Sequence, residues 1–544
     1  MGLPEVGVRR LDHHGVVSGV IDDLGFVEVL DEAVGLDGRE KLTVGQVVKG
    51  LIINGLGFSD SPLYLTPDFF EHLPLERLFG PGVTSEDFNR HRLSRVLDKL
   101  FECGLEKLFS LCASRAVLCE GVDTSRQVLD TTSFSVSGAY KGSEEGEEEE
   151  GRVRIVHGFS KDHRPDLKQV VTELIVSCEG GIPLHFCCHD GNASDSRVFQ
   201  ERVKALQERF QPSGTLIADS KLYAKEGIPA LKKLRFITRI PENNHAVGQE
   251  ITKALGQKAS EWESLCLDEK RVFHYRGREL EHNGIRQRWV VVYSQEGLKR
   301  AEKSLQKKAS QERESLEKKF KALRGETFSC PDDAQKAYKK LIKKVSYHEL
   351  AEPQVTRVES YGKTRGRPRR GVIPAETFFQ INPQIQKPLD LTQHIKEEAC
   401  FVLGTNDLAL SDLEVLKSYK EQGRVEEGFS FLKDPEFFTS SFFLKSPKRI
   451  CALLMVMSLA LLAYKIAQLR LRRALVAAGD TIPNQIKKPI QNPTMKWVFQ
   501  IFRGINELSF EMQGEVKVVL QGLKELQLKI ITYLGPHVQG LYQA

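Results

Sequence analysis

The stretch RQVLDTTSFSV (126–136) predicts a buried strand that ends in polar residues, with Asp130 at the end of the strand. Three further apolar runs follow it, separated by the turn sequences EGG and HDGN. Two of them resemble antiparallel partners of the first strand because they are joined to each other by a short turn. The runs are VRIVHGFS (153–160), QVVTELIVSC (169–178) and IPLHFCCH (182–189).

Helices and strands then alternate along the chain. A helix is predicted over residues 194–210, with Ser194 as its N-cap. The segment GTLIADSKLY (214–223) predicts a short apolar strand that delivers Asp219 at its C-terminal end. A short helix and strand over 227–241 and a last strand over 399–407 complete the pattern. This order is compatible with an α/β fold built on an RNase H-like mixed sheet.

A late helix is predicted to begin at Ser411 and to run without interruption to about Lys433. Ser411 and Glu414 have the spacing of a capping box, which marks a helix start. Pro435 disfavours helical geometry at the residue before it, so the helix should end near Lys433.

The segment YKEQGRVEEGFSFLKDP (419–435) of this helix contains two adjacent glutamates. At about 100° per residue, Glu426 shares one polar stripe with Tyr419, Gln422 and Lys433. Glu427 is turned away from that stripe by roughly 100° and is expected on a solvated face. A pair of glutamates on a surface helix is ordinary, so the register alone distinguishes Glu426 as the candidate for chemistry.

Asp130, Asp219 and Glu426 lie on separate elements that an RNase H-like core brings to one edge of its sheet. Carboxylates gathered in this way repel one another unless cations neutralise them. Hard oxygen ligands suit Mg²⁺ or Mn²⁺. Two such ions activate an attacking oxygen and stabilise a leaving oxygen on phosphorus. Each acid alone is weak evidence, because an aspartate at a strand end is usually a turn or cap residue.

Five stretches, taken in order, resemble DDE transposases of prokaryotic insertion sequences: LDTTSF, GFSKDHRPDLKQ, GNASD, IADSKLY and VEEGFSFLKDP. The resemblance covers about residues 120–465. In this group the third acid lies in a Tyr-x-x-Arg-x-x-x-Glu helix with a lysine seven residues later, and here Gln422 stands in place of the arginine. The acids are 219 − 130 = 89 and 426 − 219 = 207 residues apart. The long second interval fits the β-rich insertion that these transposases carry before the last acid.

The resemblance implies a metal-dependent DNA transposase that hydrolyses transposon ends and transfers the freed 3′-OH to target DNA. Asp130, Asp219 and Glu426 would hold two Mg²⁺ or Mn²⁺ ions, while Tyr419 and Lys433 would position phosphates, with Gln422 beside them. Transposon-end and target DNA would be the partners, and synapsis of two ends implies at least a homodimer on DNA. A nuclease without strand transfer and a domesticated DNA-binding protein are the alternatives.

A basic loop, KTRGRPRRG (363–371), is a second candidate for DNA contact. It resembles an AT-hook, whose Arg-Gly-Arg-Pro core lies in a narrow minor groove. Arg365, Arg367 and Arg369 are its candidate DNA-binding residues, and a basic solvated loop is the alternative. His157, His163, His185 and His189 show no compact metal-ligand spacing, which favours surface or packing roles.

The whole chain of 544 residues, with net charge +5, is long enough for several domains. Its ten cysteines include no CxxC pair and no apolar signal core precedes them, so reduced thiols in a prokaryotic cytoplasm are expected. The apolar run Ile450–Tyr464 is shorter than the roughly 20 residues that a bilayer requires, which favours a buried helix and no membrane. The predicted parts are a helical N-terminal domain (1–120), the first part of the core (121–242), an insertion with β and helical parts (243–398), the last strand and the Glu426 helix (399–470), and a C-terminal helical region (471–544).

Overall fold

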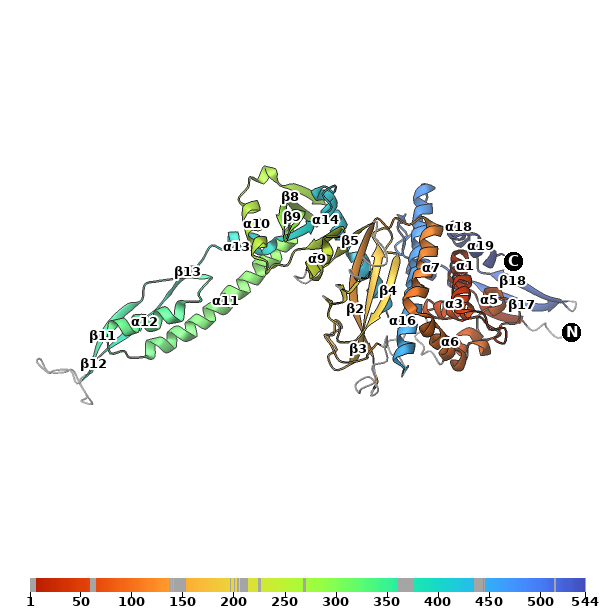
Figure 1. The fold of residues 1–544 in the computed structure, drawn as a ribbon, viewed down its shortest axis with the longest axis horizontal. Coiled ribbons are helices and arrows are strands. Elements are labelled where there is room, and N and C mark those ends of the chain that lie inside the picture. Colours follow the sequence, from red (N-terminus) through yellow and green to blue (C-terminus); the bar gives the residue numbers. More distant parts are fainter. Residues whose placement is uncertain are drawn as a thin grey trace, which may run out of the picture.

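The structure is a computed structural model, and the molecule it shows is elongated (Figure 1). An arm lies at one end, a large sheet in the middle, and a group of helices with both chain ends at the other (Figure 1). The described residues are 6–58, 65–136, 138, 140, 153–195, 197–199, 201–202, 205, 214–223, 227–267, 271–360, 376–434, 444, 446–512 and 515–543.

The central sheet has nine strands in the order β4-β3-β2-β5-β6-β14-β9-β8-β7. Its first five members are antiparallel from β4 to β2 and parallel from β2 through β5 to β6. Taken in chain order, this is the 3-2-1-4-5 arrangement of an RNase H-like core, so the predicted fold class is confirmed. The strands are β2 (Arg126–Val136), β3 (Lys168–Ser177), β4 (Pro183–His189), β5 (Thr215–Ala218) and β6 (Phe236–Arg239), with the short helix α9 (Ile228–Leu231) between the last two.

The first part of the segment expected to be an insertion adds strands to this sheet, and the rest of the segment lies outside it. Strand β14 (Phe401–Thr405) pairs antiparallel with β6 on one side and with β9 (Ile285–Ser294) on the other. The first part of the insertion is therefore continuous with the core sheet, because an unpaired edge of β14 would leave backbone groups without partners. The other elements here are α10 (His245–Leu255), β7 (Glu263–Cys266) and β8 (Val272–His282).

The rest of the insertion forms the arm (Figure 1). The long helix α11 (Gln295–Gly325) leads outward from the sheet, and its far end packs in a small separate core around Phe320, Tyr338 and Ile381. The arm also contains α12 (Pro331–Ile342), β10 (His348–Leu350), β11 (Gln354–Ser360), β12 (Glu376–Asn382), β13 (Ile385–Pro388) and the returning helix α13 (Thr392–Ala399).

Helix α16 (Pro447–Ala477) joins the sheet to the helical end of the molecule (Figure 1). It contacts β4 and α15 on one side and the N-terminal helices on the other. It is long and apolar enough to cross a membrane, but 94% of its most apolar window is buried within the protein. A core helix with apolar residues all around it is expected to be buried in this way, as the sequence predicted for Ile450–Tyr464. The N-terminal elements are α1 (His14–Leu24), α2 (Phe26–Val34), α3 (Val44–Gly55), α4 (Thr66–Glu71), α5 (Leu75–Phe79), α6 (Arg90–Cys103) and α7 (Leu105–Glu120).

The two ends of the chain fold together. Strand β1 (Val6–Arg10) pairs with β17 (Asn506–Met512), which pairs with β18 (Glu515–Gln521). Helix α1 packs closely on α19 (Pro536–Leu541), because a side chain at Gly19 would meet the backbone of Val538 at 2.6 Å. The region that was expected to be helical contains this hairpin beside its helices, and the exposed strand β18 gave little sequence signal. The remaining elements are β15 (Ile482–Pro483), β16 (Pro489–Ile490), α17 (Met495–Ile501) and α18 (Glu525–Leu534).

Candidate acidic active site

Asp130 and Asp219 lie on adjacent parallel strands. Asp130 is in β2, and Asp219 directly follows β5, which runs beside it. Burial is the main cause that raises the pKa of Asp130 to about 6; the carboxylates of Asp219 and Asp195 add to the rise, and the charge of Lys161 opposes it. Burial also raises the pKa of Asp219. Two partly desolvated carboxylates close to each other are typical of a functional site.

The predicted late helix is interrupted. It consists of α14 (Asp412–Lys420) and α15 (Gly423–Leu432), with a tight turn at Glu421 and Gln422. The capping box at Ser411 is present as predicted. At the turn the backbone N–H of Gln422 donates to the carbonyl of Tyr419, three residues back, at 3.1 Å. The expectation of one continuous helix is therefore corrected; Gly423 at the start of α15 has low helix propensity, which favours a break here.

Glu426 and Glu427 have different neighbours, as predicted, despite this break in the helix. Burial raises the pKa of Tyr419, and the charges of Asp219 and Glu426 both add to this rise, so these three residues share one neighbourhood. Glu427 lies elsewhere: its carboxylate is 3.0 Å from the ammonium of Lys465 on α16. The Glu427 side chain is 56% exposed, as expected for a solvated face, although its carboxylate also pairs with the buried Lys465.

Lys433, at the end of α15, contacts the segment that precedes β3. Its ammonium is 2.6 Å from the carboxylate of Asp162 and 5.5 Å from the centre of the Phe134 ring of β2. This ion pair ties the GFSKDHRPDLKQ stretch to the helix that carries Glu426. Gln422 lies at the turn between α14 and α15, on the C-terminal side of Tyr419.

Asp195 belongs to this site, although the sequence did not single it out. It accepts a hydrogen bond of 2.6 Å from the hydroxyl of Thr131 and lies 3.3 Å from the ammonium of Lys161. Lys221, two residues after Asp219, forms an ion pair with the same carboxylate. Lys161, Asp195 and Lys221 line a cavity of about 170 Å³. The GNASD motif could have identified Asp195 as a site residue, because Asp195 follows Ser194, the N-cap of a predicted helix.

A group of cations lies on the other side of Tyr419. Burial lowers the pKa of Lys420, and the charges of Arg300, Arg239 and Arg271 lower it further. The Lys420 ammonium is 4.0 Å from the centre of the Phe273 ring of β8. Since Arg239 also influences Tyr419, this basic cluster borders the acidic site. The sequence did not predict this cluster, because Arg239 in β6, Arg271 before β8 and Arg300 in α11 are distant from Lys420 along the chain.

One group among the described residues has three ligand atoms within 4.8 Å of one another: Glu173, Cys187 and His189 on β3 and β4. Glu173 is fully buried and already bonds to His189 at 2.8 Å and to Arg202 at 2.6 Å. A guanidinium on the same carboxylate favours a structural charge network over a metal site. His189 thus has the packing role that the sequence favoured. Arg365, Arg367 and Arg369 lie outside the described residues.

The geometry of this site can be set beside known proteins. A sequence profile described as "Transposase DDE domain" matches residues 123–463, and one described as a domain of unknown function (DUF4277) matches residues 6–114. Because the first match spans more than half of the chain, the protein belongs to the transposase DDE domain family. No match was found among curated proteins.

Among solved structures, the chain is similar to the piggyBac transposase in a cryo-EM structure of its synaptic complex with hairpin DNA. The two share 8% sequence identity with a TM-score of 0.26, over 50% of this chain. The chain spans 60% of the length of that transposase.

Proposed function

We propose that this protein is a DNA transposase. The observation that supports the proposal is the pair of half-buried aspartates Asp130 and Asp219, with the exposed Glu426 near the same Tyr419, in a chain of the transposase DDE domain family. In the first step, a water oxygen bonds to the phosphorus at a transposon end, the bond to the 3′ oxygen breaks, and that oxygen takes up a proton. In the second step, the freed 3′-OH loses its proton and bonds to a phosphorus of target DNA, the bond from that phosphorus to the 3′ oxygen of the target strand breaks, and the leaving oxygen takes up a proton.

The donor set fits divalent cations. The candidate ligands are carboxylate oxygens, which Mg²⁺ and Mn²⁺ prefer. Burial raises the pKa of Asp130, and the Lys161 ammonium is 4.0 Å from its carboxylate, so a closer cation would favour the ionised form. We infer that Asp130, Asp219 and Glu426 hold two such ions. When bound, these ions would lower the energetic cost of negative charge on the attacking and leaving oxygens.

The residues around the acids would orient DNA. Tyr419 is half-buried beside Asp219 and Glu426, so its hydroxyl can contact a phosphate at the reacting end. Lys433 and Gln422 would contact the same strand from the two ends of α15. The basic cluster around Lys420 extends the positive surface away from the acids and would follow the backbone further. Arg365, Arg367 and Arg369 would contact the minor groove of the same DNA.

The partners would be transposon-end DNA and target DNA, bound by a homodimer that holds two ends together. The site of action would be the cytoplasm of a prokaryote, where the element's DNA is accessible.

The test uses a duplex that carries the terminal repeat found beside the coding sequence, incubated with Mn²⁺. Cleavage and strand transfer should occur, stop with EDTA, and be lost in Glu426→Gln while binding to the end is retained. Glu427→Gln is the matched control, because its carboxylate faces Lys465 and not the acids. Cleavage without strand transfer would indicate a nuclease, and undiminished cleavage in EDTA or in Glu426→Gln would overturn the proposed site.

A further inference from the structure

Asp195 is held by three side chains that come from other parts of the chain. Its side chain is 10% exposed and accepts a hydrogen bond of 2.6 Å from the hydroxyl of Thr131. It also forms ion pairs with the ammonium groups of Lys221 and Lys161, the latter at 3.3 Å. Burial would raise the pKa of Asp195, but these three partners lower it below its ordinary value, so the carboxylate is ionised at neutral pH. A largely buried, ionised carboxylate with several donors can anchor neighbouring segments.

Two of these partners also bond to the candidate metal ligands. The backbone N–H of Thr131 donates to Oδ1 of Asp130 at 2.8 Å, and the backbone N–H of Lys221 donates to Oδ1 of Asp219 at 2.9 Å. Thr131 and Lys221 therefore each bond to one acid through the backbone and to Asp195 through the side chain. The same arrangement on both sides links Asp130 to Asp219 through Asp195.

The strand register explains why one carboxylate can reach both segments. The parallel pairing of β2 with β5 ends with Val128 opposite Ile217. Asp130 and Asp219 each lie two residues further along, so the two acids are level with each other beyond the end of the pairing. Because Asp219 comes just after β5 ends, strand pairing by itself does not fix its position. Side-chain contacts are needed to set the separation of the two acids.

The third partner extends this linkage toward the helix of Glu426. Lys161 pairs with Asp195, and the next residue, Asp162, pairs with Lys433 at the end of α15, at 2.6 Å. The segment that carries Lys161 and Asp162 therefore joins Asp195 to the helix that carries the third acid.

The contacts of Asp195 favour a role in orienting the ligands over direct metal binding. Its Oδ1 accepts from Thr131, and its Oδ2 pairs with the ammonium groups of Lys221 and Lys161. Both oxygens are thus engaged, and two cations beside the carboxylate would repel a metal ion.

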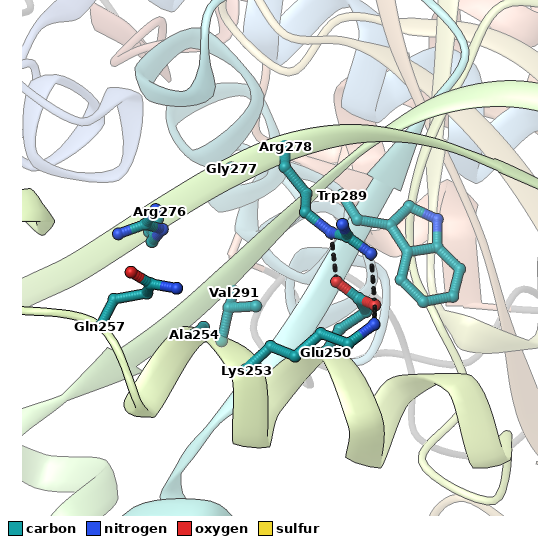
Figure 2. A pocket seen from close by; sticks show the side chains of 9 residues that line it. All are labelled: Glu250, Lys253, Ala254, Gln257, Arg276, Gly277, Arg278, Trp289 and Val291. Atoms are coloured by element: carbon teal, nitrogen blue, oxygen red, sulfur yellow. Dashed lines mark hydrogen bonds and ion pairs between the residues drawn. The ribbon is translucent and has the colours of Figure 1, made fainter.

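A carboxylate with similar burial elsewhere in the chain provides a contrast (Figure 2). The Glu250 side chain on α10 is 9% exposed; Arg278 of β8 donates two hydrogen bonds to it, and the Lys253 ammonium lies at 3.0 Å (Figure 2). Both clusters therefore consist of one carboxylate and two cations. Among the described residues, however, neither partner of Glu250 bonds to a candidate metal ligand. Linkage to the acids distinguishes Asp195 from an ordinary structural ion pair.

We propose that Asp195 is a positioning residue that, through Thr131 and Lys221, sets the separation and orientation of Asp130 and Asp219 and thereby their affinity for divalent cations. This role rests on the proposed function, because it requires that the two acids bind the ions. Loss of a group that orients metal ligands typically weakens metal binding by about 10- to 100-fold.

The experiment measures Mn²⁺ binding to the full chain without DNA, by electron paramagnetic resonance of free Mn²⁺, and the urea unfolding midpoint without metal. Thr131→Val is the main variant, because it removes the hydroxyl that bonds to Asp195 without changing the charge of the site. It should weaken Mn²⁺ binding by about tenfold. Thr131→Ser keeps the hydroxyl and should restore the affinity of the unmodified protein.

Asp195→Asn is a second, independent variant, so a failure of Thr131→Val to fold would leave the proposal testable. It should weaken Mn²⁺ binding at least as much, because it also weakens the pair with Lys221. Adding Thr131→Val to Asp195→Asn should cost less than the two separate losses combined, since both changes break the same contact.

Glu250→Gln is the matched control, because it removes a carboxylate charge from a similarly buried cluster with two cations. It should lower the urea unfolding midpoint and leave Mn²⁺ affinity unchanged. Equal weakening of Mn²⁺ binding in Glu250→Gln would indicate general loosening of the structure and would overturn the proposal.

Unchanged Mn²⁺ affinity in a folded Thr131→Val would also overturn it, even if Asp195→Asn bound Mn²⁺ more weakly, because that loss would then reflect charge alone. The two proposals fail in different ways. An unmodified protein that binds no Mn²⁺ would refute the metal site and the role of Asp195 together. Normal binding in the unmodified protein with no change in Thr131→Val would refute the role of Asp195 alone.

Discussion

Replacing Asp130 with asparagine is expected to stabilise the protein without metal at pH 8 and to weaken its response to divalent cations. The Asp130 side chain is 21% exposed, and its carboxylate lies near those of Asp219 and Asp195. Asparagine is nearly isosteric and its side-chain oxygen can still accept the 2.8 Å hydrogen bond from the N–H of Thr131. The substitution thus removes charge while leaving the local geometry in place.

The pKa of Asp130 gives the size and sign of the effect. Its rise from 3.8 to about 6 corresponds to at most roughly 3 kcal/mol of unfolding free energy. Since the folded state binds this proton more tightly than the unfolded state, the contribution favours folding below about pH 4 and is lost as the pH rises through 6. Asp130→Asn should therefore raise the unfolding free energy by about 1–3 kcal/mol at pH 8 and by less at pH 5.

Urea unfolding of both proteins at pH 5 and pH 8, with and without Mn²⁺, measures this change in unfolding free energy. Mn²⁺ should raise the unfolding midpoint of the unmodified protein at pH 8, because a ligand of the folded state stabilises it, and it should do so much less in Asp130→Asn. Asp166→Asn is the control, because the Asp166 side chain is 60% exposed and its ion pair is with Arg164, two residues away. A loss of stability at pH 8, or an undiminished response to Mn²⁺, would refute the charge-cluster argument.

Three further results are expected. Glu427→Gln should lower the unfolding free energy by about 1 kcal/mol, because it leaves the buried Lys465 without its carboxylate; urea unfolding that matches the unmodified protein would contradict this. Gly428→Val should reduce cleavage and cost about 1–3 kcal/mol of stability, because even a Cβ at Gly428 would be 3.3 Å from Leu461 on α16 and the larger side chain would displace α15; Gly428→Ala is its control, and full activity in the valine variant would show that α15 tolerates the shift. Lys420→Ala should weaken DNA binding and reduce the slope of log affinity against log salt by about 1, in a salt titration that an uninvolved lysine would leave unchanged.

Local patterns in the sequence were sufficient for the core elements. Alternating and continuous apolar runs predicted the strands β2, β3, β4, β5 and β6, because the spacing of apolar side chains indicates which faces of a strand are buried. The separation of Glu426 from Glu427 followed from helical geometry over a few residues and survives the break at Gly423. The capping box at Ser411 was equally local, since it depends on two side chains three residues apart.

Other features depend on contacts between distant segments, which no local pattern records. Asp195 joins the acidic site through Thr131 and Lys221, which lie 64 and 26 residues away along the chain. The pairing of Glu427 with Lys465 depends on how α15 packs against α16. Likewise, β14 could be recognised as a strand, but its position between β6 and β9 depends on backbone hydrogen bonds, which have the same chemistry in every strand.

A cavity lined by His13, His14 and Arg503 shows the same division. The sequence determined that two adjacent histidines follow Asp12 at the start of a helix. Only the tertiary structure decided their tautomers, because the carbonyls of Leu56 and Leu11 fix the proton on one nitrogen of each ring. It also brought Arg503 to the same cavity from the far end of the chain, since burial of α1 against the C-terminal helices is favourable only when both ends of the chain are folded.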